Sequence, residues 1–378
     1  KFTAQVDLPA RLTLYSLQLV SISKGKSELL KSVSDIQCGD AFIIMGQSNA
    51  VATDFGPTTP TFTSPWIQTF TDRFVPARYR NIDGQNGEIG YWGMELAKKL
   101  VTKHKIPVCI VNGAVGGTRI DQHQRSKDNP LDTSTLYGSL LTRVTAAGLN
   151  YGIRGIFWHQ GENDQGADGP SGGFGHETYR ALFISLSNAW AQDYPNSQMT
   201  YMFQIWPKSC AMGIDGSDNV LRDVQRLLPD AMDRLAIMST LGIDPPGGCH
   251  YLADGYAAMA NLIFPLVDNL TYGVKMKQPV GPPRLTSVKR ASNNSSIVTL
   301  TFDQPVVWMD SLRSEFLIDG KRGQVLRGEA TGNTMRLVTS GSSGRTLSYL
   351  DSAAWSQQRL LRGKNGIAAL TFAGVAIR

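Results

Sequence analysis

Hydrophobic and polar positions alternate along the first forty residues of the chain. The stretches "RLTLYSLQLVSIS" (11–23) and "ELLKSVSDIQ" (28–37) both have this alternation, which is typical of β-strands. The pattern changes near residue 40. From there, short apolar runs alternate with longer segments whose apolar positions have helical spacing, and this order predicts a parallel sheet covered by helices on both faces.

The expected strands and helices alternate from residue 40 to about residue 275. We expect strands at 41–45, 106–114, 153–160, 199–206 and 233–242, and helices at 90–104, 134–150, 177–194, 217–231 and 251–270.

A Pro/Gly-rich stretch, "KMKQPVGPPR" (275–284), interrupts this alternation. Short strands with Gly, Asn and Ser turns follow it, and they predict a β-sandwich. The expected domains are therefore an N-terminal β segment (1–39), an α/β domain (40–275) and a C-terminal β-sandwich domain (284–378).

Composition and charge narrow the classes of function. The 378 residues are 42% hydrophobic and carry a net charge of +6. Lys and Arg are scattered, so we expect no nucleic-acid partner. No window approaches the roughly 20 apolar residues that span a bilayer, so we expect no membrane partner. The sequence gives no oligomeric state, and no signal peptide is visible in it.

The four cysteines match no zinc-binding spacing. Cys109 lies in an apolar run, and we expect a buried thiol there. Cys210 and Cys249 lie in loop-like stretches. They either pair in an oxidising compartment or remain two free thiols, and the sequence leaves both alternatives open.

The carboxyl ends of the expected strands are the place to look for a site, because ligands bind there in open α/β sheets. "GQSN" (46–49) follows the first apolar strand. Ser48 is either a nucleophile presented at the rim of the sheet, with Gly46 allowing a tight turn, or part of an ordinary strand-to-loop turn. The surrounding residues are not the G-x-S-x-G elbow.

Acyl-ester chemistry also needs a general base and donors for the oxyanion. In "GAVGGT" (113–118), Gly117 either offers its backbone amide to the oxyanion or only permits a turn. The cluster "HQGEND" (159–164) either supplies a side-chain donor, Asn163 or Gln160, or is a hydrogen-bonded loop. His250, before the last helix, is the candidate base, although a lone His there is usually structural.

Together these motifs resemble those of the SGNH/GDSL-type esterases. "GQSN", the two glycines of "AVGGT", "HQGEND" and the late histidine resemble more narrowly the sialate O-acetylesterases and the acetylxylan-esterase-like carbohydrate esterases. The resemblance covers about 40–275. It implies a three-layer α/β/α, flavodoxin-like SGNH hydrolase domain, flanked by the N-terminal β segment and the C-terminal β-sandwich.

The resemblance implies a secreted or periplasmic carbohydrate O-acetylesterase that acts on sialic acid or xylan-type glycans through an acetyl-enzyme, without a metal or an organic cofactor. Ser48 would be the nucleophile and His250 the base. The backbone amides of Ser48 and Gly117, with Asn163 or Gln160, would form the oxyanion hole. The expected substrate-binding residues are Gln47, Asn49, Arg119 and His159.

One position departs from the family pattern. SGNH enzymes usually have an Asp three residues before the catalytic His, and here that position is Gly247. Three alternatives remain for orienting His250. Glu162 of "HQGEND" is our expected acid, Asp244 could bend back through the Pro-Pro turn, or a backbone carbonyl could serve in a dyad.

Other interpretations stay open beside the esterase. Arg119 either pairs with a substrate carboxylate, as in a sialic or uronic acid, or forms a surface ion pair. His159 and Glu162 could suggest a metal-dependent deacetylase, but no second ligand pair accompanies them. A non-catalytic carbohydrate-binding relative could use Trp308 and Trp355. The Gly-rich loop 165–176 could form a rim over the site.

Overall fold

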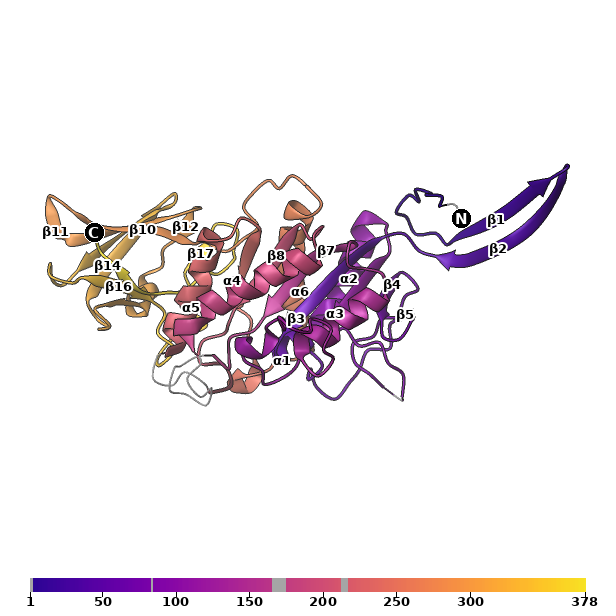
Figure 1. Ribbon diagram of the computed structural model, residues 1–378. Coiled ribbons are helices and arrows are strands. Elements are labelled where there is room, and N and C mark those ends of the chain that lie inside the picture. The colour runs from indigo at the N-terminus through magenta and orange to yellow at the C-terminus, as the bar shows by residue number, and fades with distance from the viewer. Residues whose placement is uncertain (1–2, 83, 165–174, 212–216) are drawn as a thin grey trace.

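The computed structural model describes residues 3–82, 84–164, 175–211 and 217–378. The molecule is elongated (Figure 1). A two-stranded ribbon projects at the N-terminal end, a mixed α/β unit occupies the middle, and small β-sheets lie at the opposite end. The loop predicted over 165–176 lies mostly outside the described residues.

A seven-stranded sheet in the order β5-β4-β6-β3-β7-β8-β9 forms the centre of the molecule. Its strands β6, β3, β7, β8 and β9 are mutually parallel. Numbered along the chain, these five have the order 2-1-3-4-5, which is the flavodoxin-like order. The strands span Asp40–Gly46 (β3), Ile67–Phe70 (β4), Phe74–Pro76 (β5), Val108–Asn112 (β6), Ile153–His159 (β7), Met199–Gln204 (β8) and Leu235–Ser239 (β9).

Helices cover both faces of this sheet, and the predicted three-layer α/β/α arrangement is confirmed. The buried side chains of α2 and α6 form one core with the sheet, and those of α3, α4 and α5 form the other. The helices span Ser48–Val51 (α1), Tyr91–His104 (α2), Leu136–Ala146 (α3), His176–Asp193 (α4), Ser217–Leu227 (α5) and Ala253–Leu270 (α6).

The sequence pattern did not indicate β4 and β5. These strands are only four and three residues long, which is too short for a periodicity to be recognised. They extend the sheet beyond β6, with β4 parallel to β6 and β5 antiparallel to β4.

The N-terminal alternation forms an antiparallel ribbon of β1 (Tyr15–Ser23) and β2 (Lys26–Ile36). Most of its side chains are exposed on both faces, including several large apolar ones, among them Leu19, Ile22 and Leu29. The ribbon therefore adds little to the core around the central sheet.

The C-terminal region consists of small antiparallel sheets that share one apolar core. A four-stranded sheet has the order β10-β11-β15-β14, a second has the order β13-β16-β18, and β12 pairs with β17. The strands span Leu285–Ala291 (β10), Asn294–Phe302 (β11), Val306–Val307 (β12), Phe316–Ile318 (β13), Val325–Thr331 (β14), Thr334–Thr339 (β15), Thr346–Tyr349 (β16), Arg362–Gly363 (β17) and Phe372–Ala376 (β18).

None of the helices in the described part of the chain is both long enough and apolar enough to cross a membrane.

Candidate active site

Ser48 lies where β3 ends and the short helix α1 begins. It is the one residue of the run 40–50 that is not buried. The position is the carboxyl end of β3, between β6 and β7, where the strand order of the sheet reverses. Ligands bind at this switch point in doubly wound sheets, so the fold presents Ser48 at the expected edge.

Gly46 allows the ends of β3 and β7 to approach closely. Its φ of 132° lies in the region that favours glycine, and a Cβ there would lie 2.1 Å from the carbonyl oxygen of His159. The backbone N–H of Gln47 donates to this same carbonyl at 2.9 Å. These contacts hold the turn before Ser48 against the "HQGEND" loop. No residue larger than glycine fits at position 46.

The glycine loop after β6 lies beside Ser48. A Cβ on Gly116 would lie 3.7 Å from the Ser48 Cβ, and the Val115 amide donates to the Gly46 carbonyl at 3.0 Å. Gly117 is exposed and has a φ of 73°. Within the described residues, the backbone N–H groups of Ser48 and Gly117 have no hydrogen-bond acceptor, so both are free to donate.

Gln47 organises the loop that follows β7. Its Nε2 donates to Asn163 Oδ1 at 2.9 Å. Its Oε1 accepts from the backbone N–H groups of Gly161 and Asn163 at 3.3 and 3.4 Å. Gln47 is buried. It fixes the loop conformation from beneath and offers no surface to a ligand.

The two expected side-chain donors differ in their surroundings. Asn163 is half-buried, and its Oδ1 is held by Gln47, which leaves its Nδ2 without a partner in the described part of the chain. Gln160 is buried, and its Nε2 donates to the Thr118 carbonyl and to the Asp164 carboxylate. Only Asn163 has a donor to offer to a ligand.

Asp164 completes this buried network. Burial raises its pKa to about 7, against the hydrogen bonds from Gln160 and from the Ile120 amide that favour the charged form. At neutral pH this carboxyl group is therefore partly protonated.

Asn49, Glu162 and His159 form a second buried cluster. Asn49 Nδ2 donates to Glu162 Oε1 at 3.0 Å, and His159 Nε2 lies 3.4 Å from the same oxygen. Burial alone would raise the pKa of Glu162, but the neighbouring His159 and the bond from Asn49 outweigh it and lower the pKa. Glu162 is thus held as a carboxylate.

This burial corrects three expected substrate contacts. Gln47, Asn49 and His159 are each at most 1% exposed. A side chain that solvent does not reach cannot touch a sugar, and these three instead join the loops of the site to one another.

The loop that carries His250 is held on two sides. Cys210 and Cys249 form a disulfide, which decides between the two alternatives for these residues. The Cys249 carbonyl accepts from Asn49 Nδ2 at 3.1 Å, and Asn49 Oδ1 in turn accepts from the Tyr256 hydroxyl at 3.0 Å. Asn49 therefore links α1, the "HQGEND" loop and the His250 loop.

His250 is partly exposed, and its Nδ1 lies 2.8 Å from Asp54 Oδ2. Sequence reasoning missed Asp54, which follows α1 without any motif around it. Within the described residues, no hydrogen bond joins His250 to Ser48 or to Glu162, and Asp244 is exposed without a hydrogen bond.

Arg119 forms a two-pronged ion pair with Asp121, with N–O distances of 2.8 and 3.0 Å. The surface ion pair that the sequence left open as an alternative is thus present.

The sulfur atoms of Cys210 and Cys249 and a ring nitrogen of His250 lie within 4.8 Å of one another. Because the two sulfurs are joined in a disulfide, they are not thiolate ligands for a metal in this state.

The two tryptophans considered for sugar binding are both half-buried. Trp355 packs edge-on against Trp206, with ring centres 4.8 Å apart, and Trp308 donates to Asp310 Oδ1 at 3.0 Å. Trp206 follows β8, so Trp355 brings the C-terminal region against the carboxyl edge of the sheet.

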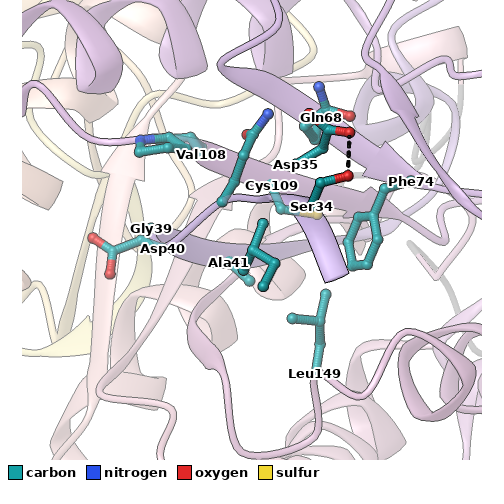
Figure 2. Close-up of a pocket in the computed structure, with 13 residues that line it drawn as sticks. Ser34, Asp35, Gly39, Asp40, Ala41, Gln68, Phe74, Val108, Cys109 and Leu149 are labelled. Atoms are coloured by element: carbon teal, nitrogen blue, oxygen red, sulfur yellow. Dashed lines mark hydrogen bonds between the residues drawn. The ribbon is translucent and has the colours of Figure 1, made fainter. Parts of the chain in front are cut away.

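A pocket of about 420 Å³ opens at the amino-terminal ends of the central strands (Figure 2). Its lining includes Gly39 just before β3, Ala41 near the start of β3, and Val108 and Cys109 at the start of β6. Cys109 as a whole residue is half-buried, and burial raises the pKa of its thiol, as expected for a thiol withdrawn from solvent. The pocket lies at the amino ends of the strands, away from Ser48.

Comparison with known proteins finds similarity in family and in fold. Residues 38–204 match the family described as "Carbohydrate esterase, sialic acid-specific acetylesterase". This match confirms the resemblance over the part of the chain that carries "GQSN", "AVGGT" and "HQGEND". A search of curated protein sequences finds no match.

One solved structure supports the fold. A carbohydrate acetylesterase from Xanthomonas citri has a TM-score of 0.67 at 15% identity, covering 94% of this chain and 84% of its own. An Arabidopsis thaliana protein has a TM-score of 0.48 at 18% identity, covering 61% and 99%. NanS has a TM-score of 0.46 at 15% identity, covering 62% and 98%.

Proposed function

We propose that this protein is a serine esterase that removes O-acetyl groups from a carbohydrate. The observation that carries the proposal is the convergence of three separate loops on the segment that holds Ser48, at the switch point of a flavodoxin-like sheet. The match of residues 38–204 to a carbohydrate esterase family supports it.

In this proposal Ser48 attacks the acetyl carbonyl, and His250 accepts the serine proton through Nε2. A sugar hydroxyl leaves with the proton that His250 returns. Water then hydrolyses the acetyl-enzyme by the reverse sequence of proton transfers. Because Ser48 and His250 are not hydrogen-bonded without substrate, the base must close on the serine in the complex, as catalytic hydrogen bonds often do.

The oxyanion hole comprises the backbone amides of Ser48 and Gly117 and the side-chain amide of Asn163. The absence of acceptors for these three donors within the described residues supports the assignment. Preorganised donors stabilise the charge of the tetrahedral intermediate without reorganising during the reaction. Gln160, which is occupied by Asp164 and Thr118, supports the loop.

The substrate class is an acetylated glycan, of the sialic acid or the xylan type. The disulfide between Cys210 and Cys249 supports a place of action outside the cytoplasm, since such bonds persist in oxidising compartments.

Acetate release tests the proposal. The purified protein and Ser48→Ala are incubated with a panel of acetylated glycans that includes a 9-O-acetyl sialoside and acetylated xylan. We expect the wild type to release acetate from at least one and the variant to lose about 10⁴-fold or more in kcat. Unchanged turnover by Ser48→Ala would exclude the serine mechanism, and sugar binding without turnover would indicate a non-catalytic relative.

A further inference from the structure

We propose that Asp54 is the carboxylate that orients His250, which makes Asp54 a positioning residue for the esterase reaction. This inference rests on the proposed function, and it concerns a residue outside all the motifs. Its basis is the 2.8 Å contact between Asp54 Oδ2 and His250 Nδ1. The position where an acid is expected, three residues before His250, is Gly247, which has no side chain.

Within the described residues, the other candidates for this role make no hydrogen bond to His250. Glu162 is buried, and its Oε1 accepts from Asn49 beside His159. Asp244 is exposed and makes no hydrogen bond with any described residue. Across residues 3–82, 84–164, 175–211 and 217–378, no backbone carbonyl accepts from the His250 ring. Asp54 is thus the group in this part of the chain that holds Nδ1.

The chemistry of the contact matches the task. A carboxylate can only accept a hydrogen bond, so the proton of a neutral imidazole is held on Nδ1. The lone pair then lies on Nε2, which is the atom that must take the proton of Ser48. When His250 becomes an imidazolium during the reaction, the same carboxylate stabilises its charge.

The loop that carries Asp54 is held in place on both sides of this residue. Arg80 Nη1 donates to the carbonyls of Thr53 and Gly56 at 3.4 and 3.2 Å. The guanidinium also lies over the ring of Phe55, 4.6 Å from its centre, and that ring is buried. Asp54 is therefore presented by a fixed backbone.

This loop also contacts the helix that follows His250. The Ala253 amide at the start of α6 donates to the Phe55 carbonyl at 3.3 Å, and Leu252 packs near Gly56. Asp54 stands six residues after Ser48, so one short segment carries both the nucleophile and the group that orients the base.

The exposure of Asp54 sets the size of the expected effect. Its side chain is 79% exposed, whereas that of His250 is 32% exposed. Solvent screens an exposed carboxylate more than the buried acid of a serine protease, whose removal costs about 10⁴-fold in kcat. We expect Asp54→Asn to lower kcat by about 10- to 100-fold and to leave KM within about twofold.

The kinetic test uses Asp54→Asn, Asp54→Glu and Asp244→Asn on the best acetylated glycan of the panel. The proposal expects the kcat loss in Asp54→Asn, partial recovery in Asp54→Glu, and wild-type kcat in Asp244→Asn. Full kcat in Asp54→Asn, or the loss appearing in Asp244→Asn instead, would overturn it. Thermal unfolding of each variant verifies that it is folded.

A spectroscopic arm separates this inference from the proposed function. The chain has five histidines, so ¹⁵N-histidine labelling with proton NMR can resolve a low-field Nδ1–H resonance of His250, assigned through its loss in His250→Ala. We expect this resonance in the wild type, Ser48→Ala and Asp54→Glu, and its loss in Asp54→Asn. Its persistence in Asp54→Asn would refute the Asp54 contact. Turnover by Ser48→Ala would refute only the esterase mechanism.

Discussion

At the scale of single residues, the site divides into side chains that can face a ligand and side chains that hold the loops. Ser48, Asn163 and His250 are each partly exposed, whereas Gln47 and Asn49 are buried among hydrogen bonds to other loops. The two groups differ in free hydrogen-bonding capacity. A buried side-chain amide whose donors and acceptor are already bonded has no group left to bind a ligand.

The first residue-scale prediction concerns the oxyanion hole. Asn163→Ala should lower kcat by about 10²- to 10³-fold and change KM little, because the lost donor acts on charge that develops in the transition state. Its melting temperature should stay near that of the wild type. Gln160→Ala is the matched comparison, and it should lower the melting temperature, because it opens a buried network. Retained kcat in Asn163→Ala would remove Asn163 from the oxyanion hole.

The second residue-scale prediction concerns how the free energy of unfolding depends on pH through Asp164. Its pKa of about 7 in the folded protein exceeds the ordinary value of about 3.9 in the unfolded chain. Between these values the folded state holds a proton that the unfolded state has lost. The stability from this group is therefore complete below about pH 4 and decreases toward pH 7, by up to about 1.4 kcal/mol per pH unit.

Urea unfolding at several pH values between 4 and 8 checks this dependence. Asp164→Asn should remove the decrease, because an amide does not titrate. Asp128→Asn, a change at an exposed aspartate, should keep it. Identical slopes in Asp164→Asn and the wild type would show that the pH dependence arises elsewhere.

At the scale of elements, strand ends and the loops between them are fixed by a few covalent and close backbone contacts. The disulfide joins the loop after β8 to the loop before α6, and these two segments are 39 residues apart in sequence. Cys249 is also the direct neighbour of His250. The bond therefore stabilises the fold and restricts the position of the candidate base.

Replacing both cysteines with serine should lower the free energy of unfolding by about 4 kcal/mol, the chain-entropy value for a closed loop of this length. It should also lower kcat, because the His250 loop gains freedom. Urea unfolding and acetate release measure the two effects. Cys38→Ser provides the control, since that cysteine is free. Equal stability and activity in the double variant would show that hydrogen bonds alone fix the loop.

At the scale of the whole molecule, the C-terminal sheets pack against the central α/β unit through α5. Arg222 on this helix is buried. It donates to Thr371 Oγ1 at 3.0 Å and to the Leu350 carbonyl at 3.1 Å, and it pairs with Asp218. A single guanidinium thus joins the helix to two separate segments of the C-terminal region.

Arg222→Ala should destabilise the protein by about 3–5 kcal/mol, because it leaves the Asp218 carboxylate buried without its partner. Arg336→Ala is the matched control. It removes an arginine from an exposed pair with Glu329 and should change stability by about 1 kcal/mol or less. Chemical unfolding of both variants measures the difference, and equal effects would argue against a buried link between the two parts.

The sequence by itself determined the order of the longer strands and helices of the α/β unit, without the short strands β4 and β5, and the end of the sheet at which chemistry could occur. Apolar runs that alternate with helical spacing specify a covered parallel sheet, because each pattern reports which local positions are buried. Strand-end motifs around Ser48, Gly117 and Asn163 could be recognised for the same reason, since each lies within a few consecutive residues. The three-domain division stays a prediction.

Only the tertiary structure decided which residues meet. Asp54 and His250 are 196 positions apart, and no local pattern marks Asp54 as a partner. The tertiary structure also decided three other features. They are the pairing of Cys210 with Cys249, the burial of Asn49 and His159, and the difference in surroundings between Asn163 and Gln160. Periodicity tells which face of a strand or helix is buried, but the inward or outward direction of a loop side chain depends on hydrogen bonds to segments that are distant in sequence.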